Sequence, residues 1–220
     1  MTSVSRLTHV EGTLHDGLWI KKVASVYTAS QVVRWLQHIK YVHSFTEDDI
    51  AAGRFPVTLE NLVIITRLQL VTFPYENTEM HYSSDHKMDI TPEGLYRRLI
   101  LDNRGSYCFG LNGLFFQMLR GLGYRAYSGS ARVNVVKDPE LPPNFTALIH
   151  MIIFVQPIEN SNETYLVDVG CGGSGPARPI LLLTGGENVV MGISPTEKHR
   201  LNMCPHPESS LGMSSIASPI

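Results

Sequence analysis

The chain has 220 residues, of which 43% are hydrophobic and 17% charged, and its formal net charge is −2. This length suffices for one sizeable domain or two small ones, and the charge gives no basic field of the kind that nucleic-acid binding needs. No apolar run approaches the ~20 residues of a membrane-spanning helix, and the first residues lack the layout of a secretory signal. Three cysteines without metal-ligand or redox spacing favour reduced thiols. We therefore expect a cytoplasmic globular protein that binds neither nucleic acid nor membranes.

The first half of the chain has a helical pattern. Residues 1–29 are weakly patterned and are expected to form an N-terminal extension. Apolar residues at i, i+3 and i+4 spacing then predict three helices. These lie within residues 30–41, 57–70 and 91–103. Thr58 is the expected N-cap of the second helix, and Thr91, followed by proline, is a typical start for the third. A fourth helix is predicted to begin near Cys108 and to end at Gly121 or Gly123.

The second half has the texture of strands. Three runs rich in β-branched and aromatic residues are separated by loops rich in Pro, Asn and Asp. They are residues 125–136, 145–156 and 163–170. Helices followed by strands indicate an α+β fold, with a helical domain at 30–123 and a β-rich domain at 124–185. The remaining residues, 186–220, have scattered Pro and Ser, and we expect an irregular, largely unordered tail.

Cys108 stands between a glycine-containing turn and the start of the fourth predicted helix. A thiol at a helix N-terminus faces unpaired backbone N–H groups and the positive end of the helix dipole, and both favour the thiolate. The thiolate is the nucleophilic form, so this position suits covalent catalysis. A buried core cysteine is the alternative interpretation, because free cysteine is among the most buried residue types.

His150 and Asp168 supply the groups that a thiol nucleophile needs. His150 lies in the apolar run ALIHMIIFV, where its imidazole can act as a base, and Asp168 ends the run TYLVDVG, where its carboxylate can orient that imidazole. Each also has an ordinary explanation, as a sheet-face histidine and as an aspartate in a turn. The order Cys, His, Asp is that of papain-like thiol enzymes, and the two predicted strands can pair as a hairpin that faces the helix of Cys108.

Four motifs, in order, resemble those of the arylamine N-acetyltransferase family. RGSYCFGLNGLFFQMLRGLGY is similar to the family signature Arg-Gly-Gly-x-Cys-x-x-x-Asn, followed by a helix that ends in Leu-Gly-Phe or Leu-Gly-Tyr. FPYEN is similar to the Pro-Phe-Glu-Asn turn of the family, and TALIHMIIFV to its histidine strand. YLVDVGCGG is similar to its Tyr-Leu-Val-Asp-Val-Gly-Phe-Gly segment. The resemblance covers roughly residues 30–183.

The resemblance implies that Cys108, His150 and Asp168 form a catalytic triad. In the ping-pong reaction of the family, the thiolate takes acetyl from acetyl-CoA and an aromatic amine or hydrazine then accepts it. No metal takes part. The implied fold is a papain-like thiol-enzyme core, in which a helical bundle precedes an antiparallel, β-barrel-like domain.

The resemblance also implies which residues surround the triad. The positions expected to approach CoA are Thr146, Ala147, Gly172, Gly173 and Ser174, the last three through backbone N–H groups that can meet a pyrophosphate. A plain strand-end loop explains that glycine turn equally well. The residues expected to line the acceptor pocket are Tyr75, Phe109, Ile149 and Cys171. For support behind the nucleophile we expect a buried ion pair between Arg104 and Glu76, and Asn112 holding the start of the helix.

Three features depart from the family pattern. Ser106 replaces the second glycine of the signature, and Cys171 replaces an aromatic residue of the acceptor pocket, which predicts an altered amine preference and a second thiol that oxidation can link to Cys108. Family members also continue with a third domain that covers the cleft. Without it we expect a wide cleft, exposed apolar surface, weak cofactor binding and self-association through the uncovered cleft.

The leading interpretation is therefore an acetyl-CoA-dependent arylamine N-acetyltransferase. A thiol hydrolase or a transglutaminase-like acyl-transfer enzyme with the same triad is the first alternative, and FPYEN argues against it, because a generic thiol protease does not need that turn. A catalytically silent binding or regulatory protein is the second alternative. The expected lack of a lid supports this alternative, and the complete triad argues against it.

Overall fold

The computed structural model describes residues 10–203 except 137 and 139. Its helices, in chain order, are α1 (Ala29–His38), α2 (Glu47–Ala51), α3 (Leu59–Thr72), α4 (Thr78–Tyr82), α5 (Pro92–Tyr96) and α6 (Cys108–Gly121). A π-helical turn, η2 (Arg97–Leu101), continues α5, and two short 3-10 turns are η1 (His15–Gly17) and η3 (Gly172–Ser174). Within the described ranges, no helix has the length and apolarity needed to cross a membrane.

Side-chain caps fix where the predicted helices begin. Thr28 accepts a hydrogen bond from the backbone N–H of Gln31 at the start of α1, and Thr58 and Thr91 cap α3 and α5 in the same way. The four predicted helices are therefore confirmed, with Thr58 and Thr91 at the expected positions. The short helices α2 and α4 were not predicted, because five residues are too few to show a helical period.

The strands form an open antiparallel sheet. The four strands are β1 (Arg125–Ala131), β2 (His150–Gln156), β3 (Tyr165–Val167) and β4 (Ile180–Leu181), and they pair in the order β1-β2-β3-β4. The predicted β2–β3 hairpin is confirmed, with Ile153 opposite Val167. The predicted barrel-like closure is wrong, because β1 and β4 lie at opposite edges and do not pair with each other. With only two residues, β4 offers too short an edge to close the sheet.

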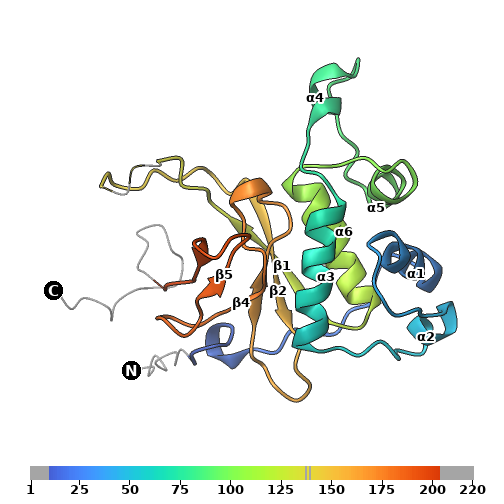
Figure 1. The fold of residues 1–220 in the computed structure, drawn as a ribbon, viewed down its shortest axis with the longest axis horizontal. Helices are drawn as coiled ribbons and strands as arrows, with labels where there is room; N and C mark the ends of the chain where they lie inside the picture. Colours follow the sequence, from blue (N-terminus) through green and yellow to red (C-terminus); the bar gives the residue numbers. More distant parts are fainter. Residues whose placement is uncertain (1–9, 137, 139, 204–220) are drawn as a thin grey trace, which may run out of the picture.

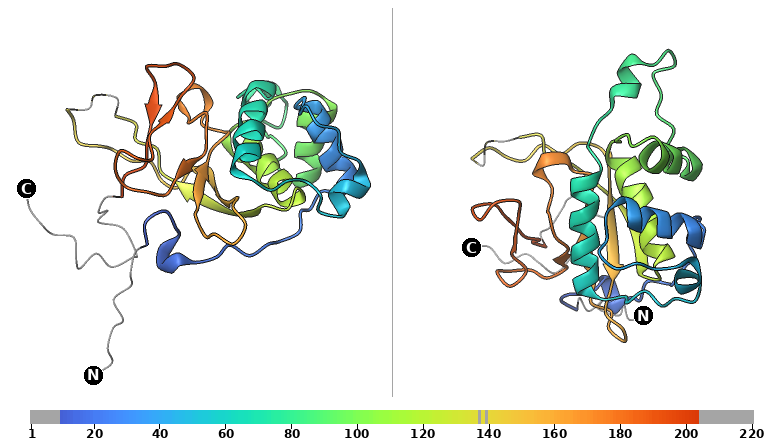
Figure 2. Two further views of the ribbon diagram at one scale, coloured as in Figure 1. Left: turned by 60° about the horizontal axis from the view of Figure 1, so that its bottom comes forward. Right: turned by 45° about the vertical axis from the view of Figure 1, so that its right-hand side comes forward.

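Helix α6 lies between the sheet and the helices α1 and α5 (Figures 1 and 2). It contacts β1 and β2 on one side and α1 and α5 on the other. Its apolar stripe of Leu111, Leu114, Phe115 and Met118 is buried, at 2% exposure or less for each residue. Because α6 is held on both sides, its first residue, Cys108, has a well-defined position relative to β2 and β3.

Segments expected to be irregular also have structure. Residues 10–27 run along the sheet, where the backbone N–H of Ile20 donates to the Gln156 side chain at 2.9 Å and that of Gly12 donates to the Leu182 carbonyl at 2.8 Å. Beyond residue 186, β5 (Val190–Met191) and β6 (Lys198–His199) form a small hairpin. The rest of the expected tail, 204–220, lies outside the described residues. The domain boundaries stay predictions.

Candidate active site

Cys108 is the first residue of α6 and is buried, with 8% of its surface exposed. Its Sγ lies 3.8 Å from the carbonyl oxygen of Ile149, the residue before β2. The predicted placement of this thiol at the N-terminus of a 14-residue helix is therefore confirmed. The unpaired N–H groups of the first turn favour negative charge at this position, as the thiolate requires.

His150 and Asp168 meet beside this thiol. His150 begins β2, Asp168 follows β3, and the pairing of the two strands brings His150 Nε2 to 2.6 Å from Asp168 Oδ2. The hydrogen bonds that His150 makes with Asp168 and with Cys108 outweigh burial and raise the pKa of His150 to about 9. Since Nε2 is engaged by Asp168, Nδ1 is the ring nitrogen available to the thiol. The three predicted triad residues are thus brought together as a Cys–His–Asp relay.

Asn112, one turn after Cys108 on α6, joins the helix to both strands. Its Nδ2 donates to Asp168 Oδ1 at 2.9 Å and to the Met151 carbonyl at 2.8 Å. Its Oδ1 accepts from the backbone N–H of Val169 at 2.9 Å. Asn112 is fully buried, so each of these bonds forms in a low-dielectric interior, where an unpaired group would be costly. The expected support by Asn112 therefore extends beyond the helix start to the carboxylate of the triad.

Gly170 allows the strand end to approach α6. A Cβ added at this residue would lie 2.8 Å from both the Cα and the carbonyl oxygen of Cys108, and 2.6 Å from Asn112 Nδ2. The backbone atoms of Cys108 belong to a packed helix and cannot move aside. The spacing between Asp168 and the nucleophile therefore requires glycine at residue 170.

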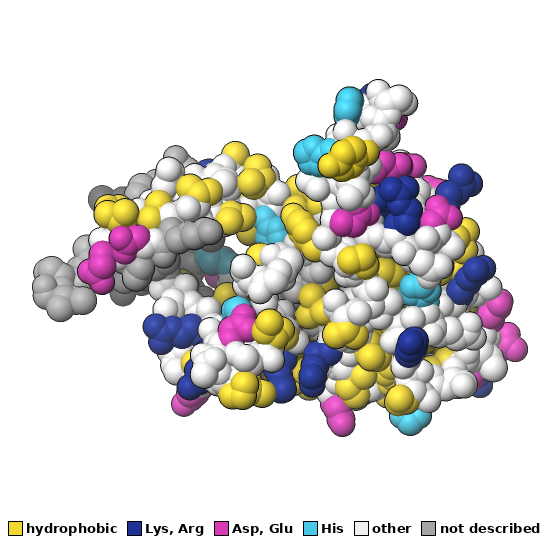
Figure 3. All heavy atoms as spheres, turned by 45° about the horizontal axis from the view of Figure 1, so that its top comes forward, with side chains coloured by type: hydrophobic (Ala, Val, Ile, Leu, Met, Phe, Trp, Pro, Cys, Tyr) yellow, Lys and Arg dark blue, Asp and Glu magenta, His cyan; other side chains and the backbone are white. Residues whose placement is uncertain are grey.

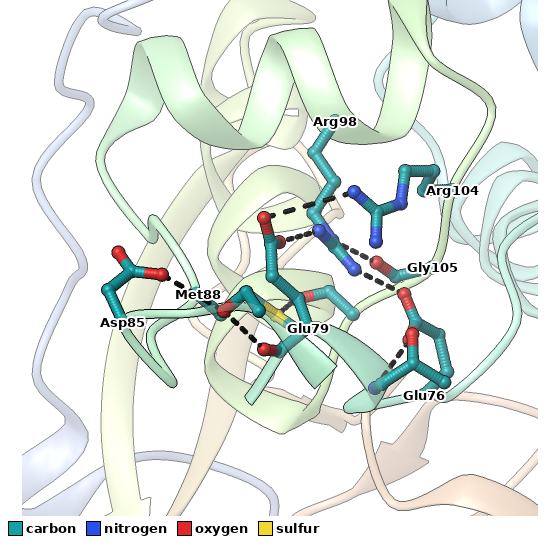
Figure 4. Close-up of polar contacts among 10 residues, drawn as sticks. Glu76, Glu79, Asp85, Met88, Arg98, Arg104 and Gly105 are labelled. Atoms are coloured by element: carbon teal, nitrogen blue, oxygen red, sulfur yellow. Dashed lines mark hydrogen bonds and ion pairs between the residues drawn. The ribbon is translucent and has the colours of Figure 1, made fainter. Parts of the chain in front are cut away.

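The expected ion pair between Arg104 and Glu76 is wrong. The arginine that binds Glu76 is Arg98, from the π-helical turn η2, and the same guanidinium also binds Glu79 (Figure 4). Arg104 is 45% exposed and reaches only Glu79, at 3.8 Å. A sequence signal for Arg98 exists, since it shares the i, i+3, i+4 stripe of Leu95 and Leu99, where a buried cation needs acidic partners.

A pocket of about 310 Å³ opens between α3, α6 and the segment that follows Asp168, and none of the residues that line it is charged or belongs to the triad. Tyr75, Gly172, Gly173, Leu111 and Val169 are among them. Burial raises the pKa of the Tyr75 phenol, and the charges of Cys108, Cys171 and Asp168 raise it further. A pocket of this composition suits an uncharged aromatic group.

The other predicted pocket residues are divided between two places. Cys171 is exposed and offers its Sγ within 4.8 Å of ligand atoms of His150 and Asp168, and Ile149 is 51% exposed beside the thiol. Phe109 lines a different pocket, of about 270 Å³, with Met151. It therefore does not share the pocket of Tyr75. Cys171, His150 and Asp168 are the one trio in the described part of the chain with metal-ligand spacing, and two of them are already bonded to each other.

The predicted CoA contacts lie on both sides of the site. Thr146 accepts at Oγ1 from the backbone N–H of Val133 at 2.9 Å and donates from Oγ1 to the Ala147 carbonyl at 2.8 Å, so its hydroxyl is engaged within the loop. Gly172, Gly173 and Ser174 form η3, and Gly172 lies against the Tyr75 ring. A Cβ added at Gly173 would meet nothing within 4 Å, so there is open space beside this residue.

An arm formed by the described residues between Arg132 and Ile149 leads into His150 and projects from the sheet (Figure 1). Its exposed apolar side chains are Val133, Val135, Leu141, Phe145, Leu148 and Ile149. Figure 3 shows hydrophobic side chains along the arm, beside a hollow between the two halves of the molecule. The apolar surface expected beside the cleft is thus present, and self-association through it stays a prediction.

Comparisons with known proteins agree with this geometry. A family model described as N-acetyltransferase matches residues 58–194. The arylamine N-acetyltransferase of Mycobacterium tuberculosis is 36% identical over 135 residues, which are 60% of this chain and 46% of that protein. An N-malonyltransferase of Fusarium pseudograminearum is 30% identical over 210 residues, which are 90% of this chain and 59% of that protein.

Among solved structures, the arylamine N-acetyltransferase of Mycobacterium marinum in complex with CoA has a TM-score of 0.56 at 29% identity. The match covers 70% of this chain and 52% of that one. The fold and these matches define the class as that of the N-acetyltransferases, and the site brings Cys108, His150 and Asp168 together on this fold. The chain belongs to the arylamine N-acetyltransferase family, and it spans about half the length of the curated relatives that it matches.

Proposed function

We propose that this protein is an acyl-CoA-dependent N-acyltransferase that carries the acyl group on Cys108 and delivers it to an aromatic amine or hydrazine. The observation that carries the proposal is the relay in which Asp168 orients His150 toward a thiol at a helix N-terminus. The uncharged pocket beside Tyr75 supports a flat, uncharged acceptor. Both half-reactions need only these groups and the two substrates.

In the first half-reaction, Cys108 Sγ attacks the thioester carbonyl of the donor after its proton has passed to His150. The bond between the carbonyl carbon and the CoA sulfur breaks, and the CoA thiolate takes the proton from the imidazolium. In the second, the amine nitrogen attacks the Cys108 thioester and an amide forms. His150 accepts the amine proton as the Cys108 sulfur leaves.

The acyl donor has two candidates. Acetyl-CoA is the donor implied by the arylamine N-acetyltransferases that the chain resembles. Malonyl-CoA is the second, because the similarity to an N-malonyltransferase extends over 90% of this chain. We propose CoA contacts at the η3 turn, where a Cβ added at Gly173 would meet nothing within 4 Å, and at Ala147.

Acylation of Cys108 is the first expected result. Purified protein incubated with each donor should gain the mass of one acyl group, and Cys108→Ser should abolish the gain while Cys171→Ser retains it. No acylation by either donor at millimolar concentration would refute the proposal and favour a silent binding protein. Acylation followed only by hydrolysis, with no acylated arylamine, would favour the thiol hydrolase.

A further inference from the structure

Arg98 is the most buried of the charged groups around the loop between η2 and α6, with only 6% of its side chain exposed. It does not touch the thiol. Instead, its guanidinium reaches three segments that converge before α6 (Figure 4). One nitrogen binds Glu76, a second binds Glu79 on α4, and Nε donates to the carbonyl oxygen of Gly105 at 2.5 Å. A planar fork with several donors suits this three-way contact.

The loop that Arg98 holds leads directly into the nucleophile. Arg98 contacts it twice, since the Arg98 carbonyl also accepts from the backbone N–H of Arg104 at 3.0 Å. Ser106, two residues before Cys108, is fully buried and pairs with the 74–76 segment. The backbone N–H of Ser106 donates to the Pro74 carbonyl at 3.2 Å, and that of Glu76 donates to the Ser106 carbonyl at 3.0 Å.

Steric contacts at Gly105 restrict the conformation of the loop that precedes α6. A Cβ added at Gly105 would lie 2.2 Å from the Pro74 carbonyl oxygen and 2.6 Å from Glu76 Cγ. Burial raises the pKa of Glu76, but hydrogen bonds from Thr78 and Arg98 more than offset it, so the pKa is lowered overall and Glu76 stays ionised at neutral pH. The loop is thus pressed against the very residue whose carboxylate Arg98 binds.

The charged side chains around Arg98 carry equal numbers of positive and negative charges, so their effect on Cys108 can be one of position and not of electrostatics. Two arginines, Arg98 and Arg104, face two glutamates, Glu76 and Glu79. The cluster therefore adds little net field at Cys108. Its effect on the thiol is geometric: Asn112 anchors α6 one turn after Cys108, and the Arg98 contacts anchor the chain just before it.

We propose that Arg98 is a positioning residue, whose three contacts fix the loop before α6 and so set the place of the Cys108 thiol against His150. The proposal rests on the proposed function in that Cys108 is taken as the nucleophile. A thiol displaced by about 1 Å can lose on the order of 100-fold in rate.

The test measures thiol reactivity, which needs no acyl donor. Arg98→Met should lower the rate of iodoacetamide alkylation of the Cys108 peptide at neutral pH at least tenfold, and the rate should then rise only as the pH approaches ~8.5, the ordinary pKa of a free thiol. Arg98→Lys keeps the charge but not the fork, so it should recover only a small part of the rate. Arg104→Met, which removes the exposed arginine of the same cluster, should stay within twofold of the unchanged protein.

Each contrary outcome has a distinct meaning. Full recovery by Arg98→Lys would overturn the geometric role, because charge alone would then suffice. A lower melting temperature with an unchanged alkylation rate in the folded protein would also overturn it, leaving Arg98 a purely structural residue. If Arg98→Met does not fold, Glu76→Gln weakens one of the three contacts of Arg98 and should lower the alkylation rate severalfold. An unchanged alkylation rate would count against the proposal. If the unchanged protein is not acylated but the alkylation rates of the Arg98 and Arg104 variants differ as expected, the proposed function is wrong and the positioning role of Arg98 is supported.

Discussion

Asp168→Asn is expected to lower the rate of acyl-enzyme formation by roughly 10⁴-fold, the order found when the orienting aspartate of a serine protease triad is replaced in this way. The reason lies in the bonds of Asp168. Its Oδ1 accepts from Asn112 Nδ2 and from the Gly170 backbone N–H, each at 2.9 Å. An asparagine must therefore keep its oxygen at that position and turn its NH₂ group toward His150. That group donates to Nε2, leaves the proton of the neutral ring on Nδ1, and stops His150 from accepting the thiol proton.

The same substitution has a pH signature. The pKa of His150 is raised from 6.5 to about 9 in the folded protein. The stability contributed by its protonated, carboxylate-bound form is therefore complete below about pH 6.5 and is lost as the pH rises through about 9. The deficit in unfolding free energy of the Asp168→Asn variant, relative to the unchanged protein, should consequently be largest near pH 6.5 and shrink as the pH rises through about 9. Urea unfolding at several pH values measures this difference.

Alkylation of the Cys108 peptide gives the matching kinetic profile. The unchanged protein should react at a rate that varies little across neutral pH, because the helix N-terminus and a neighbouring imidazolium favour the thiolate. In the variant, the rate should rise only near ~8.5, the ordinary value for a free thiol. Asp48→Asn, the same change at an exposed aspartate on α2, serves as the control. An Asp168→Asn variant with an unchanged profile would mean that Asp168 does not orient His150.

The sequence predicts the parts of the site that depend on local pattern and chain order. Caps such as Thr58 and the apolar stripe of α6 define the helices, and the pairing of β2 with β3 then brings His150 to Asp168. The open sheet could not be predicted in this way, because closure depends on whether the edge strands β1 and β4 meet.

The arginine behind the loop shows a second limit of sequence reasoning. Arg104 stands beside the nucleophile in the sequence and was the expected partner of Glu76, yet its side chain is 45% exposed. Arg98 is ten residues before Cys108, and the π-helical turn η2 places its side chain behind the loop. The stripe that Arg98 shares with Leu95 and Leu99 indicates that it is buried, but the sequence does not display the π-helical turn that directs its guanidinium behind the loop.

Gly170→Ala is expected to disable the site while leaving all three triad residues in the chain. The added methyl group would approach the Cα and carbonyl oxygen of Cys108 to 2.8 Å and Asn112 Nδ2 to 2.6 Å. Either α6 moves away from the strand end or the bonds from Asn112 to Asp168 and Val169 lengthen. Overpacking of this kind costs about 1–3 kcal/mol of stability, and a shift of about 1 Å between thiol and imidazole lowers the acylation rate on the order of 100-fold.

Gly173→Ala is the matched control for this prediction, because it adds the same methyl group three residues along the same segment, where nothing lies within 4 Å. Its stability should stay within about 0.5 kcal/mol of the unchanged protein, and its acylation rate should change little, since a proposed contact between CoA and the Gly173 backbone N–H does not involve a side chain. Thermal unfolding and acyl-enzyme formation, followed by intact-protein mass, give both quantities for both variants. If Gly170→Ala is as active as Gly173→Ala, then α6 and the strand end are not held as closely as the structure places them, and the position of the nucleophile does not depend on this contact.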